Sequence, residues 1–360
     1  MKRFLLVLVC MALYIPPLVS SPLLQTERGT IGMGSAGVAL SASPSSFFYN
    51  PALLYTGVRE EGFFTLSGSY HDSIRPANFR NNVQNPLMQN PFTHLSVSFS
   101  GKNVALTLQN QVSLNERQDR SDLGLTRYKG LTHTLIQLDW ATGRSFFAFG
   151  LNVKALAVSE RNPIDIRNDS ILTDFVVQTS LGKFEPIESE AFISVGIGLL
   201  LDYDWFKMGI TSDNFAFAPG SDPLQVSVDE IYKTLDWGFS FSTPTYDSNN
   251  LLHLFKVQGA LDFVDLGSED TRELRTGIAL KLQLLPTWSV SLKSGYREKK
   301  KLPSDLLKFD FTQGTHTLGL SAQLGAFTLD IACEIPIDWY RGTTDDNSVV
   351  QGVLALSFSI

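Results

Sequence analysis

The sequence predicts an all-β protein, a transmembrane antiparallel up-and-down β-barrel of about 14 strands. Three observations predict this fold. The N-terminus resembles an export signal, apolar residues alternate with small or polar ones beyond Gly62, and long connectors alternate with short ones. Charged residues make up only 18% of the 360 residues and aromatic residues 11%, which is typical of a protein with much exposed apolar surface.

The N-terminus predicts a signal peptide over residues 1–20. Two basic residues precede an apolar run from Phe4 to Ile15, and small residues follow at Ser20 and Ser21. A membrane anchor is the alternative, because no charge occurs between Arg3 and Glu27. Pro16 and Pro17 would break a spanning helix near its middle, which favours the signal peptide.

The two cysteines predict neither a lipid anchor nor a disulfide. Cys10 lies inside the apolar run and follows Val9, where a lipoprotein signal has a small residue. Cys333 is then the only cysteine of the mature chain, so no intramolecular disulfide can form. Backbone pairing and packing must stabilise the fold.

A period-two pattern predicts each strand in turn. In the sixth strand, alternate apolar residues from Ile193 to Leu201 form one face, while Ser194, Gly196 and Gly198 lie on the other. The 14 predicted strands are Gly62 to Tyr70, Thr93 to Phe99, Asn103 to Val112, Leu131 to Trp140, Ser145 to Val158, Ser189 to Leu201, Trp205 to Ser212, Thr234 to Ser242, Leu252 to Val264, Glu273 to Leu284, Thr287 to Tyr296, Lys308 to Leu324, Phe327 to Ile335 and Val349 to Ile360.

Connector lengths distinguish a membrane barrel from a soluble sandwich, because such barrels have short periplasmic turns and long outer loops. The predicted outer loops are Tyr70 to Phe92, Ser113 to Gly130, Ser159 to Glu188, Asp213 to Lys233, Asp265 to Arg272, Arg297 to Leu307 and Pro336 to Ser348. The connectors between them are shorter, as at Gly101, Asp202 to Asp204 and Gly325. Long and short connectors therefore alternate, as an even-stranded barrel requires.

Composition and motifs argue against several functions. The net charge of −7 excludes wrapping of nucleic acid, which needs a basic face. Gly32 to Gly37 matches G-x-G-x-x-G, but no strand precedes it and Pro44 ends any helix after it, so no nucleotide site is expected. The five histidines lack ligand spacing, and no catalytic signature occurs. We therefore expect no metal, no cofactor and no enzymatic activity.

Two surface features are expected near the strand ends. The basic run Arg297 to Lys301 falls in a predicted outer loop, where it forms a solvated tip or attracts acidic groups. Six aromatic residues are expected to form an interfacial girdle, with some as core residues instead: Trp140, Trp205, Trp237, Trp288, Tyr296 and Trp339.

Residues Gly29 to Leu54 read GTIGMGSAGVALSASPSSFFYNPALL and resemble the start of FadL-type outer-membrane transporters, including the PorV-like branch and spirochaetal paralogues. The resemblance rests on the glycine-rich opening, the A-G-V-A-L run and the Y-N-P-A-L ending. It implies an N-terminal hatch inside a fourteen-stranded barrel in the bacterial outer membrane. One departure is the C-terminus: Phe358 stands two places before the end, where the assembly machinery of the outer membrane commonly reads a final Phe.

The resemblance divides the chain into a hatch segment at residues 21–61 and a barrel at 62–360, and implies membrane lipid and a hydrophobic ligand such as a long-chain fatty acid as partners. The hatch is too polar and glycine-rich for a lipid-facing strand. Its glycines permit close backbone approach, and Asn50-Pro51 favours a rigid turn. The candidate gating residues are Gly32, Gly34, Gly37, Phe47, Phe48, Tyr49, Asn50, Pro51 and Ala52.

Three functions remain open from the sequence. The first is uptake of a hydrophobic substrate, gated by the hatch. The second is a PorV-like shuttle or binding barrel for exported proteins. The third is a structural or adhesive outer-membrane protein.

Overall fold

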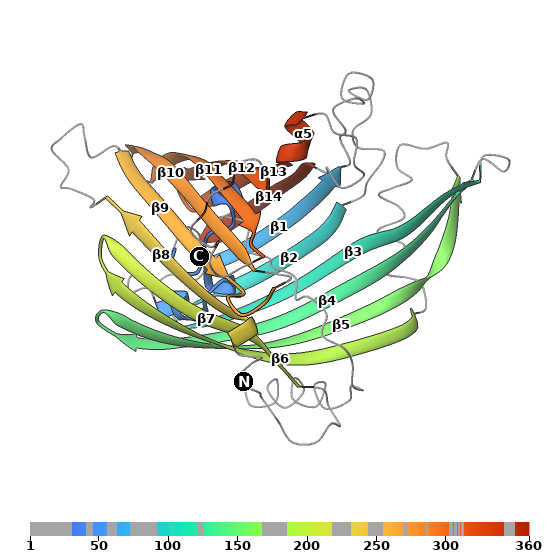
Figure 1. Cartoon of the computed structure of the whole chain (residues 1–360), viewed down its shortest axis with the longest axis horizontal. Coiled ribbons are helices and arrows are strands. Elements are labelled where there is room, and N and C mark those ends of the chain that lie inside the picture. Colours follow the sequence, from blue (N-terminus) through green and yellow to red (C-terminus); the bar gives the residue numbers. More distant parts are fainter. Residues whose placement is uncertain are drawn as a thin grey trace.

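Fourteen strands close into one antiparallel barrel in the part of the chain that the structure, a computed structural model, describes (Figure 1). The described residues are 31–40, 46–55, 63–72, 92–101, 103–120, 125–167, 186–217, 232–243, 255–269, 272–285, 287–301, 305, 308, 310, 313–341 and 350–359. The predicted signal peptide lies outside them. Each strand pairs with its sequence neighbours, and β1 pairs with β14 to close the barrel.

The strands are longest on one side of the barrel, from β3 to β6 (Figure 1). Their bounds are β1 Phe63–Asp72, β2 Phe92–Ser100, β3 Val104–Arg120, β4 Leu125–Arg144, β5 Phe147–Arg167, β6 Pro186–Tyr203, β7 Phe206–Phe217, β8 Leu235–Ser242, β9 Phe255–Val264, β10 Glu273–Leu285, β11 Trp288–Lys299, β12 Thr315–Leu324, β13 Phe327–Pro336 and β14 Val350–Ser359. Three 3-10 turns precede β1: η1 Ile31–Met33, η2 Ser46–Phe48 and η3 Pro51–Tyr55.

All 14 predicted strands are present, but some predicted ends were wrong. The β3–β4 hairpin continues to Arg120 and Leu125, through most of the stretch predicted as a charged loop. Charged residues continue the ladder there, because residues of opposite charge such as Glu116 and Lys129 are register partners. A strand end outside the lipid needs no apolar face, so charge alone does not mark where a strand stops. The twelfth strand was predicted too long, since β12 begins at Thr315.

The alternating pattern separates a lipid-facing surface from a polar interior. In β4, Leu138 and Trp140 are exposed on the outside, whereas Gln137 and Asp139 are buried on the inside. The same alternation runs through β10, where Ile278 and Leu280 are exposed and Ala279 is buried. Closure leaves no unpaired sheet edge, which hydrocarbon could not solvate. The core of this protein is therefore the barrel lumen.

Short hairpin turns lie at one end of the barrel. Residues with positive φ occupy three of them: Ser145 (54°), Asp204 (53°) and Gly325 (63°). A two-residue hairpin needs this left-handed conformation to match the twist of its strands. These turns mark the end that outer-membrane barrels direct to the periplasm.

The prediction of an aromatic girdle is confirmed in part. Trp140, Trp205, Trp237 and Trp288 are exposed, and Trp205 and Trp288 lie at the short-turn end. Tyr296 is one of the core aromatics instead, because it points inward and is 4% exposed. Its hydroxyl lies within hydrogen-bond distance of three acceptors, the Glu298 carboxylate and the backbone carbonyls of Asp310 and Gln313, and donates its one proton among them. The Trp339 side chain lies outside the described set.

The basic run was wrongly placed in a loop, because Arg297, Glu298 and Lys299 belong to β11. Lys300 forms an ion pair with Glu298 at 2.8 Å, and both side chains are buried. Arg297 pairs with Glu334 on β13 at 2.9 Å. Local carboxylates thus neutralise much of the charge that was expected to attract acidic groups.

One short helix, α5 (Ile337–Arg341), follows β13. No helix among the described residues is long and apolar enough to cross a membrane.

Barrel orientation gives a direct prediction. Epitope tags inserted between β5 and β6 or between β7 and β8 should be reached by antibody on intact cells, because long connectors face outward. A tag at the turn between β6 and β7 should be reached only after the outer membrane is opened. The reverse result would show that the barrel has the opposite orientation in the membrane.

Candidate functional site

The described parts of the N-terminus, residues 31–40 and 46–55, cross the interior of the barrel; we call them the N-terminal segment. Its turn η1 contacts β10 to β13, while η3 contacts β4 to β6 on the other side. Blue turns are visible within the curved wall in Figure 1. Most side chains of the segment are buried, including Met33, Val38 and Leu53. This segment is the candidate site, because it lies buried in the lumen and contacts the wall on both sides.

Small residues on the inner face of the barrel wall leave room for the N-terminal segment. Inward-facing glycines on β5 to β8, β10 and β11 lie so close to backbone or side-chain atoms of the segment that an added Cβ would overlap them; we call these glycines the inner glycine ring. They are Gly150, Gly198, Gly209, Gly238, Gly277 and Gly295. Six residues make three direct cross-strand pairs: Gly150 with Gly198, Gly209 with Gly238, and Gly277 with Gly295. Sequence reasoning missed this ring, whose only signal is small residues on the polar face of each strand.

The three glycines of the segment complete these close contacts. A Cβ at Gly32 would lie 2.7 Å from the Gly319 Cα. Gly34 has φ of +70°, and its N–H donates to Thr317 Oγ1 at 2.7 Å. Gly37 lies against the ring of Tyr49. The run that resembles a nucleotide fingerprint thus lies in a 3-10 turn and irregular backbone, and the next described residues, 38–40 and 46–55, form no α-helix.

Asn50 links the two parts of the segment to the barrel. Its Nδ2 donates to the carbonyls of Val38 and Leu199, each at 3.0 Å, and its Oδ1 accepts from Ala52 N–H at 3.0 Å. All these groups are buried or part-buried, so loss of these hydrogen bonds would leave buried polar groups without partners, which is destabilising. Pro51 then begins η3, where its fixed φ suits the first turn.

The aromatic candidates pack toward the short-turn end of β3 and β4. Phe47 and Phe48 stack with ring centroids 4.6 Å apart. Phe47 is buried with Leu54, Ala105 and Ala141. Apolar packing therefore anchors this end of the segment.

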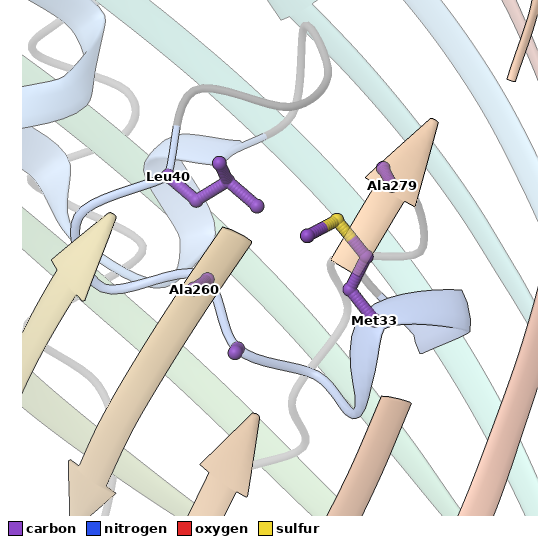
Figure 2. Close-up of a cluster of buried hydrophobic side chains, with 5 residues drawn as sticks. Met33, Leu40, Ala260 and Ala279 are labelled. Carbon is purple, nitrogen blue, oxygen red and sulfur yellow. The ribbon is translucent and has the colours of Figure 1, made fainter. Parts of the chain in front are cut away.

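A second apolar cluster anchors the other end (Figure 2). Met33 and Leu40 point toward one another and toward Ala260 of β9 and Ala279 of β10. Small residues on the wall leave room for the long residues of the segment. The cluster is complementary in shape without any covalent link.

Asp262 is a functional candidate that sequence reasoning missed. It lies inward on β9 and is fully buried, and its Oδ2 accepts the N–H groups of Gly37 and Val38 at 2.5 and 2.9 Å. Arg275 is its direct register partner on β10 and also pairs with Glu273 at 2.8 Å. The partners Gly37 and Asp262 are 225 residues apart, which no local pattern could reveal.

Replacing Asp262 tests how tightly the segment is held. Asp262→Ala should speed hydrogen exchange at the amides of Gly37 and Val38 roughly 10- to 100-fold, because each lost bond to a buried donor costs about 1–3 kcal/mol. Asp262→Asn retains an acceptor and should change exchange less. Mass spectrometry of the protein in detergent measures both, with β-strand peptides as internal reference. Equal exchange in all three proteins would show that the hydrogen bonds to Asp262 do not hold the segment in place.

The described residues contain no group of three or more His, Cys, Asp or Glu side chains that could hold a metal. Their only cysteine is Cys333, which is free. Noncovalent contacts thus hold the described segment in the lumen.

No protein-family model and no curated protein matches the sequence. Solved structures match in shape. The toluene transporter TbuX of Ralstonia pickettii has a TM-score of 0.53 at 12% identity, over 92% of this chain and 98% of its own. The monoaromatic hydrocarbon channel CymD has a TM-score of 0.52 at 11% identity, over 94% and 98%.

Proposed function

We propose that this chain, which has the fold of the FadL-like outer-membrane transporters, takes up hydrophobic molecules such as long-chain fatty acids. The chain is an outer-membrane β-barrel with an apolar outer face. The N-terminal segment acts as the hatch, and the nine gating residues act through it. One observation carries the proposal: a plug lies across the lumen and is held only by noncovalent contacts among the described residues.

Energetics support movement of this plug by a ligand. Burial of a hydrocarbon chain contributes about 0.8 kcal/mol per methylene, so ten buried methylenes contribute about 8 kcal/mol. A typical hydrogen bond contributes about 1 kcal/mol. A bound acyl chain can therefore compensate for several of the hydrogen bonds made by Asn50 and Asp262.

The proposed substrate is either a neutral hydrocarbon or a fatty acid with a charged head group. TbuX and CymD are named for toluene and monoaromatic hydrocarbons, which carry no charge. Long-chain fatty acids carry a carboxylate, and the barrel interior holds two lysines, Lys256 and Lys281, that pair with no carboxylate of the described residues and can accept it.

Uptake measurements test the proposal. Bacterial cells that lack their own fatty-acid transporter should take up radiolabelled oleate faster when they express this chain, and empty-vector cells should not. Labelled toluene serves as the neutral comparison. Absence of uptake of both compounds by cells with an assembled barrel would reject the transport function.

The shuttle function rests on a different observation. Strands β3 to β6 have 17 to 21 residues, whereas about 9–11 suffice to span a membrane. Their outer ends form an extended wall on which an exported protein could dock. Removal of the β3–β4 hairpin beyond Leu114 should then abolish co-purification of a secreted protein and leave oleate uptake unchanged. A structural barrel would show neither activity.

A further inference from the structure

Two lysines face each other on the inner wall beside the N-terminal segment. Lys256 of β9 and Lys281 of β10 are direct cross-strand partners. They alternate in phase with Ala260 and Ala279, which contact the segment, so both lysines point into the lumen. Lys281 lies between Ala279 and the turn after Leu285, which places the pair on the short-turn side of the segment.

The pair lacks a compensating charge within the described chain. Two neighbouring lysines have carboxylate partners: Lys207 lies 2.5 Å from Asp202, and Lys293 lies 2.8 Å from Asp330. No carboxylate of the described residues pairs with Lys256 or Lys281, which are both half-buried. Like charges directly opposite each other destabilise a sheet, and partial burial increases the cost.

The surroundings indicate which anion fits. Gln258 lies opposite Ala279 and Ser242, and Ser291 lies opposite Lys281, so neutral hydrogen-bonding groups flank the pair. The apolar cluster of Met33 and Leu40 begins one inward-facing residue away, at Ala279 (Figure 2). The combination of two cations, neutral polar groups and an adjacent apolar surface suits an amphipathic anion.

We propose that Lys256 and Lys281 form an anion-binding site on the exit side of the N-terminal segment, which receives the carboxylate of an acyl ligand. The inference rests on the proposed uptake function and adds a location for the head group. A carboxylate between the two ammonium groups removes their repulsion and forms charge-assisted hydrogen bonds. The site therefore favours an ionised ligand over a neutral one of the same shape.

Binding measurements on the full chain in detergent test the site. The probes are the fluorescent fatty acid cis-parinaric acid and its methyl ester, which differ only in the charged head. Lys256→Gln combined with Lys281→Gln should weaken binding of the acid at least about tenfold, because the carboxylate loses both of its charge-assisted hydrogen bonds. Binding of the ester should not change. The matched control is Lys308→Gln, because Lys308 is exposed and pairs only with nearby Asp305 among the described carboxylates.

Assembly of each variant is checked by the shift in gel migration on boiling, and removal of like charges should leave it intact. Inorganic phosphate is titrated separately, because a phosphate could bind the same two cations. If phosphate binding depends on the lysines and parinarate binding does not, the acyl carboxylate is the wrong ligand. Equal losses for acid and ester would also overturn the site.

These results are distinguishable from failure of the transport proposal. If the wild-type chain neither binds nor takes up the acid, the proposed function fails. If wild-type and double-variant proteins bind the acid equally well, that function stands and the lysine site is wrong.

Discussion

Deletion of residues 32–51 is expected to open the barrel without preventing its assembly. Every strand keeps both of its neighbours, because the ladder from β1 to β14 includes no residue of the deleted stretch. Loss of Gly34, Val38 and Asn50 removes the hydrogen bonds that hold the segment across the lumen. Single-channel conductance in planar bilayers should therefore rise clearly above the wild-type level.

A weaker variant supplies the control. Asn50→Ala with Pro51→Ala removes the hydrogen bonds to Val38, Leu199 and Ala52 but leaves the Asp262 contacts in place. It should raise conductance less than the deletion and change uptake of oleate. If the assembled deletion variant shows unchanged conductance and unchanged uptake, the segment does not gate the channel, and the transport proposal loses its main support.

The sequence predicted the barrel well because one physical requirement repeats along the whole chain. Each spanning strand must present apolar residues to lipid and small or polar residues to the lumen, so the period-two signal recurs 14 times. The fourteen-stranded barrel implied by the resemblance at Gly29 to Leu54 is confirmed, and TbuX and CymD share its fold. Strand ends were less predictable, because β3, β4 and β5 continue beyond the apolar belt with charged residues.

The candidate site consists of the N-terminal segment and the barrel wall around it, and only the residues of the segment were predictable from the sequence. Gly32, Gly34, Gly37 and Asn50 stand in a short motif whose composition does not suit a lipid-facing strand. Their partners come from strands far along the chain, and closure of the barrel brings them together. Asp262 and the paired lysines need the β9–β10 register before their roles can be recognised.

The inner glycine ring gives the second large expected effect. A Cβ at Gly295 would overlap the backbone at Gly34, and a Cβ at Gly277 would overlap Met33. Valine at both positions should therefore expel this part of the segment, since overpacking of a tight contact costs about 1–3 kcal/mol per site. Conductance should approach that of the deletion variant. Gly101→Val is the control, because a Cβ there meets nothing closer than 3.9 Å.

The glycine variants also distinguish two reasons for having glycine at these positions. Glycine either leaves space for the N-terminal segment or is required by the strands themselves. Introduced into the deletion background, Gly277→Val with Gly295→Val should cause little further change in conductance or in resistance to unfolding by heat, because the clashing backbone is gone. If the two valines impair assembly equally with and without residues 32–51, the glycines are required for the curvature of β10 and β11 and not for contact with the segment. Coupling between the two changes, measured as this double-variant difference, is the result expected of a close-fitting plug and its seat.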